Sequence, residues 1–294
     1  MLKKSILVEN KSSITTKNLQ LVIKNDYRES TIPIEDIGFV IIDNPEVYIS
    51  ITTLNLLIEN NCAVVICSKS HLPNGLFLNL NSHHIQQALF KHQINASTPL
   101  KKQLWQQTVI EKITNQGLLL EKITRNKNKF DYLASKVLSG DTSNMEGVAA
   151  NFYWKSFFKE DFKRERFGQY PNNFLNYGYA ILRAATARAL SGSGLLNTLG
   201  IHHKSKYNAF ALADDIMEPF RPLVDEAVYT LMEHYDAQEL NTEIKSVLLQ
   251  ILTRTVYFKD EKSPLMVALQ KTASSLQQCF TGEIKKIKYP KLWN

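Results

Sequence analysis

The chain has 294 residues, 44% of them apolar and 21% charged, with 11 glycines and 9 prolines. This composition suits one large domain or two small ones and excludes a disordered or low-complexity chain. The three cysteines lack metal-ligand spacing, as expected of a reduced intracellular protein. The formal net charge is +7, and since residues 1–75 are nearly neutral, the excess lies downstream. A basic body favours a polyanionic partner such as nucleic acid, although such charge can also serve only solubility.

We expect no targeting segment at the amino terminus. The apolar run 6–8 that follows Lys3 and Lys4 stops at Glu9, far short of a secretory signal. No stretch approaches the ~18 apolar residues of a membrane span. We therefore expect a cytoplasmic protein that contacts no membrane.

The first 80 residues predict a small β-domain. Short runs rich in Val, Ile and Thr alternate with polar turn residues. The predicted strands are 5–8, 14–16, 19–23, 31–33, 39–42, 63–67 and 76–78, the last after a turn at 73–75. One helix interrupts them at 50–60, where apolar residues recur at helical spacing after Ser50, a residue that can cap a helix.

Beyond residue 83 the apolar period becomes helical. The predicted helices are 83–94, 100–120, 132–138, 145–158, 174–190, 210–235, 242–257 and 265–280. The fold class is therefore α+β, with a small N-terminal β-domain followed by a larger all-α C-terminal domain. We divide the chain into a β-domain at 1–80, a linker and the start of the helical region at 81–97, and a helical domain at 98–294.

Carboxylates and imidazoles carry the chemical signal of the sequence. No phosphate loop, dinucleotide fingerprint, HExxH pair or nucleophile elbow is present, which argues against ATP hydrolysis, hydride transfer, zincin proteolysis and serine hydrolysis. The acidic and histidine residues gather in three segments: DTSNMEG at 141–147, GIHH at 200–203 and DDIMEPFR at 214–221.

Glu146 begins a predicted helix and shares its face with Ala150, Tyr153 and Phe157, an unusual place for a carboxylate. The simplest alternative is a capping box, in which Ser143 and Glu146 only satisfy the helix end. Both interpretations are compatible with the spacing.

The third segment places like charges side by side on one helix. Asp214, Asp215 and Glu218 lie among large apolar residues, where unpaired carboxylates are costly unless a cation compensates them. Arg221 could be that cation, and a bound metal ion is the other possibility. Pro219 should kink the helix beside Glu218.

Two adjacent histidines, His202 and His203, follow Gly200 in a predicted loop. Neighbouring side chains point in different directions, so at most one of them is expected to be a ligand. Carboxylate oxygens with one imidazole suit Mg²⁺ or Mn²⁺ better than structural zinc, and a divalent ion among basic residues implies phosphate chemistry.

Basic and aromatic residues interleave from 151 to 166. Lys155, Lys159 and Lys163 recur every four residues on the predicted helix that Glu146 opens, which would suit a bound phosphate backbone. Aromatic core residues with a solvated lysine face fit equally well. A second basic cluster in the C-terminal tail, Lys285, Lys286, Lys288 and Lys291, can simply be exposed.

Three linked motifs resemble the CRISPR-associated integrase family, with a likeness to members from type II systems. They are MEGVAANFYW at 145–154, NFLNYGYAILR at 173–183 and LGIHHKSKYNAFALADDIMEPFRP at 199–222. The resemblance implies a catalytic metal site in which Glu146, His203 and Glu218 bind Mg²⁺ or Mn²⁺, with Asp215 assisting from behind. It places that site in the helical domain and assigns dimerisation to the β-domain.

The resemblance further implies that the protein joins 3′-hydroxyl ends of short DNA fragments to the repeat of a CRISPR array by transesterification. Its implied partners are DNA, a second copy of the chain, a small ferredoxin-like companion protein and further type II adaptation proteins. Two alternatives stay open: a basic DNA-binding module whose acidic residues pair with Arg183 or Arg221 without a metal, and a nuclease in which water replaces the 3′-hydroxyl.

Overall fold

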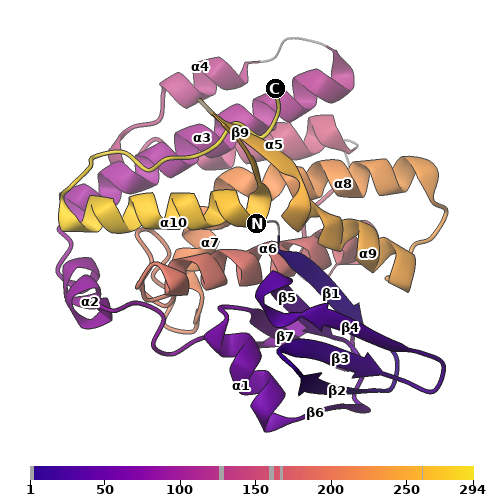
Figure 1. Cartoon of the computed structure of the whole chain (residues 1–294). Coiled ribbons are helices and arrows are strands. Elements are labelled where there is room, and N and C mark those ends of the chain that lie inside the picture. The colour runs from indigo at the N-terminus through magenta and orange to yellow at the C-terminus, as the bar shows by residue number, and fades with distance from the viewer. Residues whose placement is uncertain (1–2, 126–128, 159–161, 166–167, 260) are drawn as a thin grey trace.

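The computed structural model describes residues 3–125, 129–158, 162–165, 168–259 and 261–294. The N-terminal region is rich in strands and the rest of the chain is mostly helical, which confirms the predicted α+β class (Figure 1). Among the described residues, no helix is both long and apolar enough to cross a bilayer.

Two four-stranded sheets build the N-terminal region. The first has the order β1-β5-β7-β8, with β1, β5 and β7 parallel and β8 antiparallel to β7; the second has the order β4-β3-β2-β6. Their strands are β1 (Lys4–Val8), β2 (Ser12–Lys17), β3 (Gln20–Lys24), β4 (Glu29–Pro33), β5 (Ile37–Ile42), β6 (Val47–Ile49), β7 (Ala63–Cys67) and β8 (Pro73–Phe77). Strand β6 was not predicted, and the expected turn at 73–75 is the start of β8.

Strand β5 is buried along its whole length. Ile37, Val40 and Ile42 pack with the apolar residues of the N-terminal region, including those of helix α1 (Ile51–Glu59), whereas Phe39 and Ile41 belong to the core of the helical region. Both faces of the first sheet are therefore covered, as expected of parallel strands with a continuous apolar sequence.

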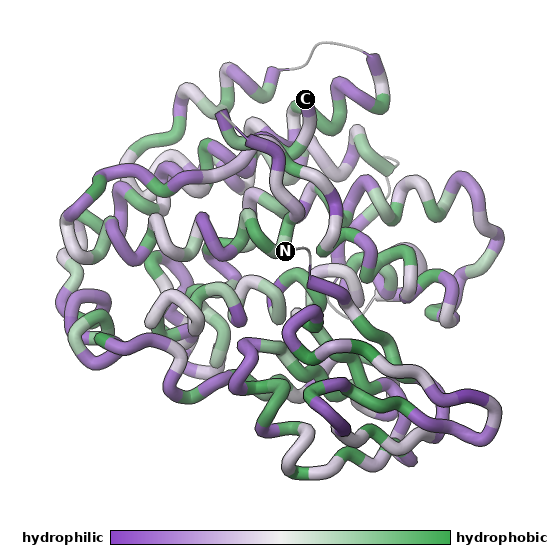
Figure 2. Tube along the Cα trace, in the orientation of Figure 1, coloured by the Kyte–Doolittle hydropathy of each residue, from purple (hydrophilic) through white to green (hydrophobic). Residues whose placement is uncertain are grey.

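Long helices form the remainder, with apolar residues inside and mostly hydrophilic loops outside (Figure 2). Helix α6 is buried over most of its length and contacts α7, α8, α9 and α10. The helices are α2 (Gln86–Ile94), α3 (Thr98–Thr124), α4 (Phe130–Ser135), α5 (Met145–Phe157), α6 (Asn172–Gly192), α7 (Ala211–Met217), α8 (Arg221–His234), α9 (Thr242–Gln250) and α10 (Leu265–Thr281).

The helix predicted over 210–235 is broken at the expected place. α7 ends at Met217, a 3₁₀ turn covers Glu218–Phe220, and α8 begins at Arg221. Pro219 cannot donate a backbone hydrogen bond, so the regular helix is interrupted by the 3₁₀ turn beside Glu218, at the position where the sequence predicts a kink.

The expectation of an all-α C-terminal region was wrong at a β-hairpin. The helix predicted over 242–257 ends at Gln250, and β9 (Thr255–Phe258) pairs with β10 (Glu261–Pro264). β-Branched and aromatic residues in TVYF favour a strand and override the helical spacing. The C-terminal segment then pairs Lys291 with Tyr257 of β9.

Candidate functional site

Glu146 lies in the first turn of α5, and its own helix end does not need it. The carboxylate of Asp141 accepts hydrogen bonds from the backbone N–H groups of Met145 and Glu146, at 2.9 and 3.0 Å. The Ser143 hydroxyl instead donates to the carbonyl of Lys136. The capping-box interpretation is therefore wrong, and the Glu146 carboxylate is left for other partners.

Glu218 occupies the 3₁₀ turn between α7 and α8, and its side chain is only 6% exposed. Arg221 Nη1 donates to Glu218 Oε1 at 2.6 Å. Burial opposes the charge on this carboxylate, but Arg221 and Lys112 outweigh it and lower the pKa of Glu218 to about 2. Glu218 is therefore ionised at neutral pH.

Lys112 of α3 joins the two glutamates, and the sequence analysis missed it. Its Nζ lies 2.6 Å from Glu146 Oε1 and 2.5 Å from Glu218 Oε2. Burial disfavours the ammonium, yet Glu218 and Glu146 together raise the pKa of Lys112. The overlooked signal was a lysine on the buried stripe of α3, next to Val109 and Ile113.

His203 is held by Asp215 of α7. The buried Asp215 carboxylate accepts hydrogen bonds from the backbone N–H groups of Ile201, His202 and His203, and it lies 2.5 Å from His203 Nδ1. This hydrogen bond is the main cause of the raised pKa of His203. With Nδ1 engaged, Nε2 is the ring nitrogen that remains for a ligand.

Gly200 is required for this turn. A Cβ atom there would lie 2.6 Å from the carbonyl oxygen of His203 and 2.7 Å from Asp215 Oδ2. The two histidines diverge, as expected of neighbours: the His202 ring stacks on Trp105 at a centroid distance of 4.1 Å. The GIHH segment thus presents one histidine to an aromatic side chain and the other to Asp215.

A cavity of about 460 Å³ brings His203 and Glu218 together. Arginine and acidic side chains also line it: Arg164, Arg183, Arg221 and Asp214. Glu146 is not a lining residue and meets Glu218 only through Lys112. Because both carboxylate oxygens contact one nitrogen, their separation cannot exceed the sum of the two short distances.

The donor set fits a hard divalent cation in chemistry, although its side chains are not gathered as ligands. Two carboxylates and one imidazole are suitable donors for Mg²⁺ or Mn²⁺. Glu218 Oε2 is buried and, although 2.5 Å from Lys112 Nζ, lacks a hydrogen bond of acceptable geometry. Within the described ranges, no three His, Cys, Asp or Glu side chains already form a metal-binding group. The metal-ligand roles of Glu146, His203 and Glu218 therefore stay predictions.

Both ion pairs expected of a DNA-binding module without a metal ion are present in the structure. Arg183 Nε and Nη2 contact the two oxygens of Asp214 at 2.5 and 3.1 Å, and Asn208 donates to the same carboxylate. Arg221 pairs with Glu218. A basic module without a metal ion is thus consistent with these contacts, and solution experiments must separate the two interpretations.

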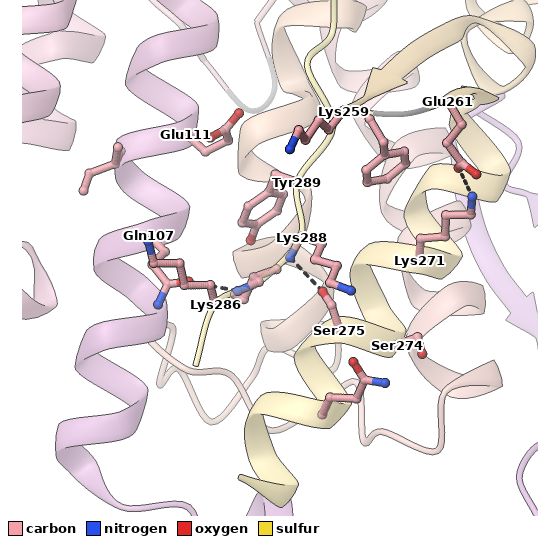
Figure 3. A pocket seen from close by; sticks show the side chains of 14 residues that line it. Gln107, Glu111, Lys259, Glu261, Lys271, Ser274, Ser275, Lys286, Lys288 and Tyr289 are labelled. Carbon is pink, nitrogen blue, oxygen red and sulfur yellow. Dashed lines mark hydrogen bonds and ion pairs between the residues drawn. The ribbon is translucent and has the colours of Figure 1, made fainter. Parts of the chain in front are cut away.

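A larger hollow of about 850 Å³ lies away from these residues, between α3, α10, the β-hairpin and the C-terminal segment (Figure 3). Four lysines line it, together with Glu111 and Glu261: Lys259, Lys271, Lys286 and Lys288. None of the predicted metal ligands does. We therefore locate the candidate site in the smaller cavity, where the acidic and imidazole groups lie.

The predicted lysine stripe is not continuous on one helix. Lys155 is exposed on α5, which ends at Phe157, so Lys163 lies beyond the helix. Lys159 lies outside the described residues. In the tail, the lysine side chains are exposed, but Ile287 and Leu292 are buried and the Lys288 carbonyl accepts from Thr272.

Comparison with known proteins shows which family this chain resembles over its whole length. The CRISPR-associated endonuclease Cas1 of Neisseria meningitidis serogroup C (strain 8013) is 37% identical over 293 residues, which cover 98% of this chain and 96% of that protein. A casposase bound to integration product has the same fold, with a TM-score of 0.80 at 20% identity over 98% of this chain and 93% of that one. A Cas1 protein from Thermotoga maritima also has this fold, with a TM-score of 0.72 and 18% identity over 95% of this chain and 97% of that one.

The fold is thus that of Cas1 proteins and of a casposase, a β-rich region joined to a helical one. The family model "CRISPR associated protein Cas1" matches residues 6–260. The chain belongs to the Cas1 family, which confirms the resemblance drawn from its three motifs.

Proposed function

We propose that this protein is a divalent-metal-dependent DNA integrase. It joins the 3′-hydroxyl end of a short DNA fragment to a phosphodiester at the edge of a CRISPR repeat. The observation that supports it best is the meeting of Glu146 and Glu218 at one ammonium group, with Glu218 and His203 facing a single cavity.

Each site residue has a distinct task in this proposal. Glu146, Glu218 and His203 Nε2 hold the ion, Mg²⁺ or Mn²⁺. Asp215 fixes the orientation of His203 through Nδ1, and Lys112 neutralises the two carboxylates. When bound, the ion supplies Lewis-acid stabilisation of charge developing on the phosphoryl group.

The proposed reaction balances without a nucleotide cofactor. A new bond forms between the attacking 3′-oxygen and phosphorus, the bond to the leaving 3′-oxygen breaks, and the hydroxyl proton is transferred to the departing strand through solvent. One phosphodiester replaces another of similar energy, which agrees with the absence of a phosphate loop from the sequence.

Glu146→Gln tests the proposal directly. It keeps the shape of a side chain that is 25% exposed and removes the charge expected to hold the ion. Loss of an electrostatic contribution of this kind costs about 10²–10³ in rate. We expect joining of fragment ends to a repeat-containing plasmid, with Mn²⁺ present, to fall by at least that factor. Undiminished joining by Glu146→Gln would refute the assignment, with Glu35→Gln in the N-terminal region as the control.

DNA and Cas proteins are the proposed partners. The fold matches part of a chain in a Cas6-RT-Cas1–Cas2 complex, with a TM-score of 0.74 and 21% identity over 99% of this chain and 36% of that one. We propose that the protein forms a homodimer through its β-domains, that a small ferredoxin-like companion joins two such dimers, and that further type II adaptation proteins assist. Sedimentation with and without a companion protein and a DNA fragment tests these assemblies.

The observed ion pairs favour one competing function, a DNA-binding module without a metal. Under this alternative Arg183 and Arg221 already satisfy Asp214 and Glu218. Calorimetric titration separates the two: the integrase shows Mn²⁺ binding that Glu218→Gln abolishes, while the module shows none. A nuclease would bind the metal but release cleaved DNA rather than joined products.

A further inference from the structure

Three arginines line the cavity beside Glu218 and His203, and one of them is not matched by a carboxylate. Arg183 pairs with Asp214 and Arg221 with Glu218. In the part of the chain that the structure describes, Arg164 forms no ion pair with a carboxylate. The lining charges of the cavity therefore leave one guanidinium in excess.

Arg164 is nevertheless held firmly. Nη1 donates to Asn172 Oδ1 at 2.9 Å and to the carbonyl of Glu165, and Nη2 donates to Asn176 Oδ1 at 2.7 Å. The guanidinium carbon lies 5.1 Å from the centre of the Tyr179 ring. Both asparagines belong to α6, so the position of the charge is set by the core helix of the domain.

The unused atom of Arg164 is the one suited to an oxyanion. Its Nε is buried and has no hydrogen-bond partner. On Arg183, Nε and Nη2 together contact the two oxygens of Asp214. The same edge of a guanidinium binds phosphate in a fork, which a lysine cannot reproduce.

The surroundings of Arg164 add to the positive potential. The Arg221 guanidinium lies over the same Tyr179 ring, at 4.2 Å. The carboxylate of Asp225 accepts hydrogen bonds from the hydroxyls of Tyr153 and Tyr179 and does not line the cavity. Burial and the proximity of Arg221 lower the pKa of Arg164 and outweigh the opposing effects of Tyr179 and Asp225, so an added anion would stabilise its charged form.

We infer that Arg164 is a phosphate-binding residue, which holds a nonbridging oxygen of a DNA phosphodiester within the cavity that Glu218 and His203 share. This inference rests on the proposed function and adds a substrate contact to it. A cavity of about 460 Å³ is in the usual range for small-ligand sites and accommodates one phosphodiester with part of its sugar.

Binding of DNA to a catalytically silent protein tests the inference without requiring turnover. In a Glu146→Gln background, Arg164→Met should weaken binding of a fluorescent DNA strand about 10- to 100-fold, as expected for a lost charge-assisted hydrogen bond. The slope of log affinity against log salt should fall by about one phosphate contact. Arg28→Met removes the same charge from an exposed hairpin and is the matched control.

A neutral phosphate identifies the contact itself. If single methylphosphonates are placed along the strand, one position should weaken binding to the Arg164 protein but not to Arg164→Met. Arg164→Lys, which retains charge but not the fork, should recover part of the salt slope and little of the affinity. Thermal unfolding of both variants shows whether the segment is still held on α6.

Specific outcomes would overturn the inference. A folded Arg164→Met with the affinity and slope of its parent, or a defect of equal size at every methylphosphonate position, would show that Arg164 only anchors its segment. Either result leaves the metal-dependent reaction intact. Conversely, full activity of Glu146→Gln would reject the proposed function while a position-specific Arg164 effect could still stand.

Discussion

Two buried lysines in this protein each hold a pair of carboxylates, yet their settings differ. Lys112 bridges Glu146 and Glu218 at 2.6 and 2.5 Å. Lys245 of α9 contacts Glu9 and Asp43 at 3.0 and 2.6 Å and joins the helical region to the ends of β1 and β5. By burial and pairing alone, the two clusters would be given the same role.

The cavity makes the difference between them. Glu218 lines a hollow with His203 and Arg164, whereas no member of the Lys245 cluster does. A second basic side chain is present in both clusters, since Arg221 contacts Glu218 and His71 contacts Asp43, so this feature does not distinguish them. A buried charge cluster thus becomes a candidate site when one of its oxygens faces a cavity with an imidazole and an unmatched cation. A cluster enclosed between two structural regions holds them together.

Removal of a buried lysine should have the largest effect on stability, and the enclosed Lys245 is the case without a metal. Lys245→Met leaves the Asp43 carboxylate, 1% exposed, without its ammonium partner. Breaking a buried pair in this way costs about 3–5 kcal/mol. Urea unfolding should show that loss. The control is Lys24→Met, which breaks an exposed ion pair with Glu29 and should change the free energy of unfolding by about zero. Addition of Mn²⁺ should not restore the stability of Lys245→Met.

Removal of Lys112 at the candidate site should destabilise the protein in a way that added metal partly reverses. Lys112→Met leaves Glu146 and Glu218 facing each other, and a comparable loss of about 3–5 kcal/mol is expected in EDTA. Mn²⁺ at 100 times its dissociation constant should return about 3 kcal/mol, because it binds only the folded state. Thermal unfolding with and without Mn²⁺ measures this recovery.

The same response of Lys112→Met and Lys245→Met to Mn²⁺ would contradict the distinction between a metal site and a structural cluster. If Mn²⁺ stabilises neither, the Lys112 cluster is structural like that of Lys245, and the metal-free module gains support. The double variant Lys112→Met, Glu218→Gln supplies the further control, since it should lose the recovery by Mn²⁺ that Lys112→Met alone shows.

Local sequence signals predicted most of the fold. Continuous apolar runs such as those of β5 and β7 identified the strands, and the helical period identified α3, α6 and α10. The hairpin of β9 and β10 was missed because 242–257 satisfies the helical spacing, and only pairing with Glu261–Pro264 makes the strand favourable. The β-branched and aromatic residues of Thr255–Phe258 are a local sign of a strand, but the pairing that forms it is a contact between separate segments, which periodicity does not show.

The candidate site was predictable only in part for the same reason. The sequence motifs place Glu146, His203 and Glu218 as metal ligands, a role that stays a prediction, and Pro219 alone predicts the interruption of the helix. The positions of Lys112 and Arg164 depend on how α3 and α6 pack against α5 and α7, which periodicity does not specify. Lys112, which reaches the site from a distant helix, is therefore missed by sequence reasoning, and Arg164, in the basic stretch 151–166, is noticed without its position being specified.

Asp225 provides a pH-dependent test of a buried carboxylate that lies behind the cavity. Burial raises its pKa to about 6, against the hydrogen bonds from Tyr179 and Tyr153. The folded protein therefore binds the proton more tightly than the unfolded chain, whose aspartate has a pKa of about 4. This stabilising contribution is present at low pH and is lost as the pH rises through about 6.

Comparison with Asp225→Asn isolates that contribution. From pH 8 to pH 5 the stability of the natural protein should rise relative to the variant by about 1 kcal/mol, measured by urea unfolding at each pH. Tyr153→Phe removes a hydrogen bond to the charged form and should move the transition to higher pH. If the difference in free energy of unfolding between Asp225→Asn and the natural protein stays constant from pH 8 to pH 5, the pKa of the Asp225 carboxyl is not raised by folding.

The smallest effect is expected at a third buried carboxylate, Glu226, which anchors the C-terminal segment. It contacts Lys122 and Arg254 at 2.6 and 2.5 Å and accepts a hydrogen bond from Trp293 Nε1 at 3.0 Å. Trp293→Phe keeps an aromatic ring and removes only that donor.

Because two cations still satisfy Glu226, the loss should be about 1 kcal/mol, the usual net worth of one hydrogen bond. A double-mutant cycle with Glu226→Gln, followed by urea unfolding, measures the coupling. A loss above 3 kcal/mol for Trp293→Phe, with little coupling to Glu226, would mean that packing of the indole ring rather than its N–H group holds the C-terminal segment against α3.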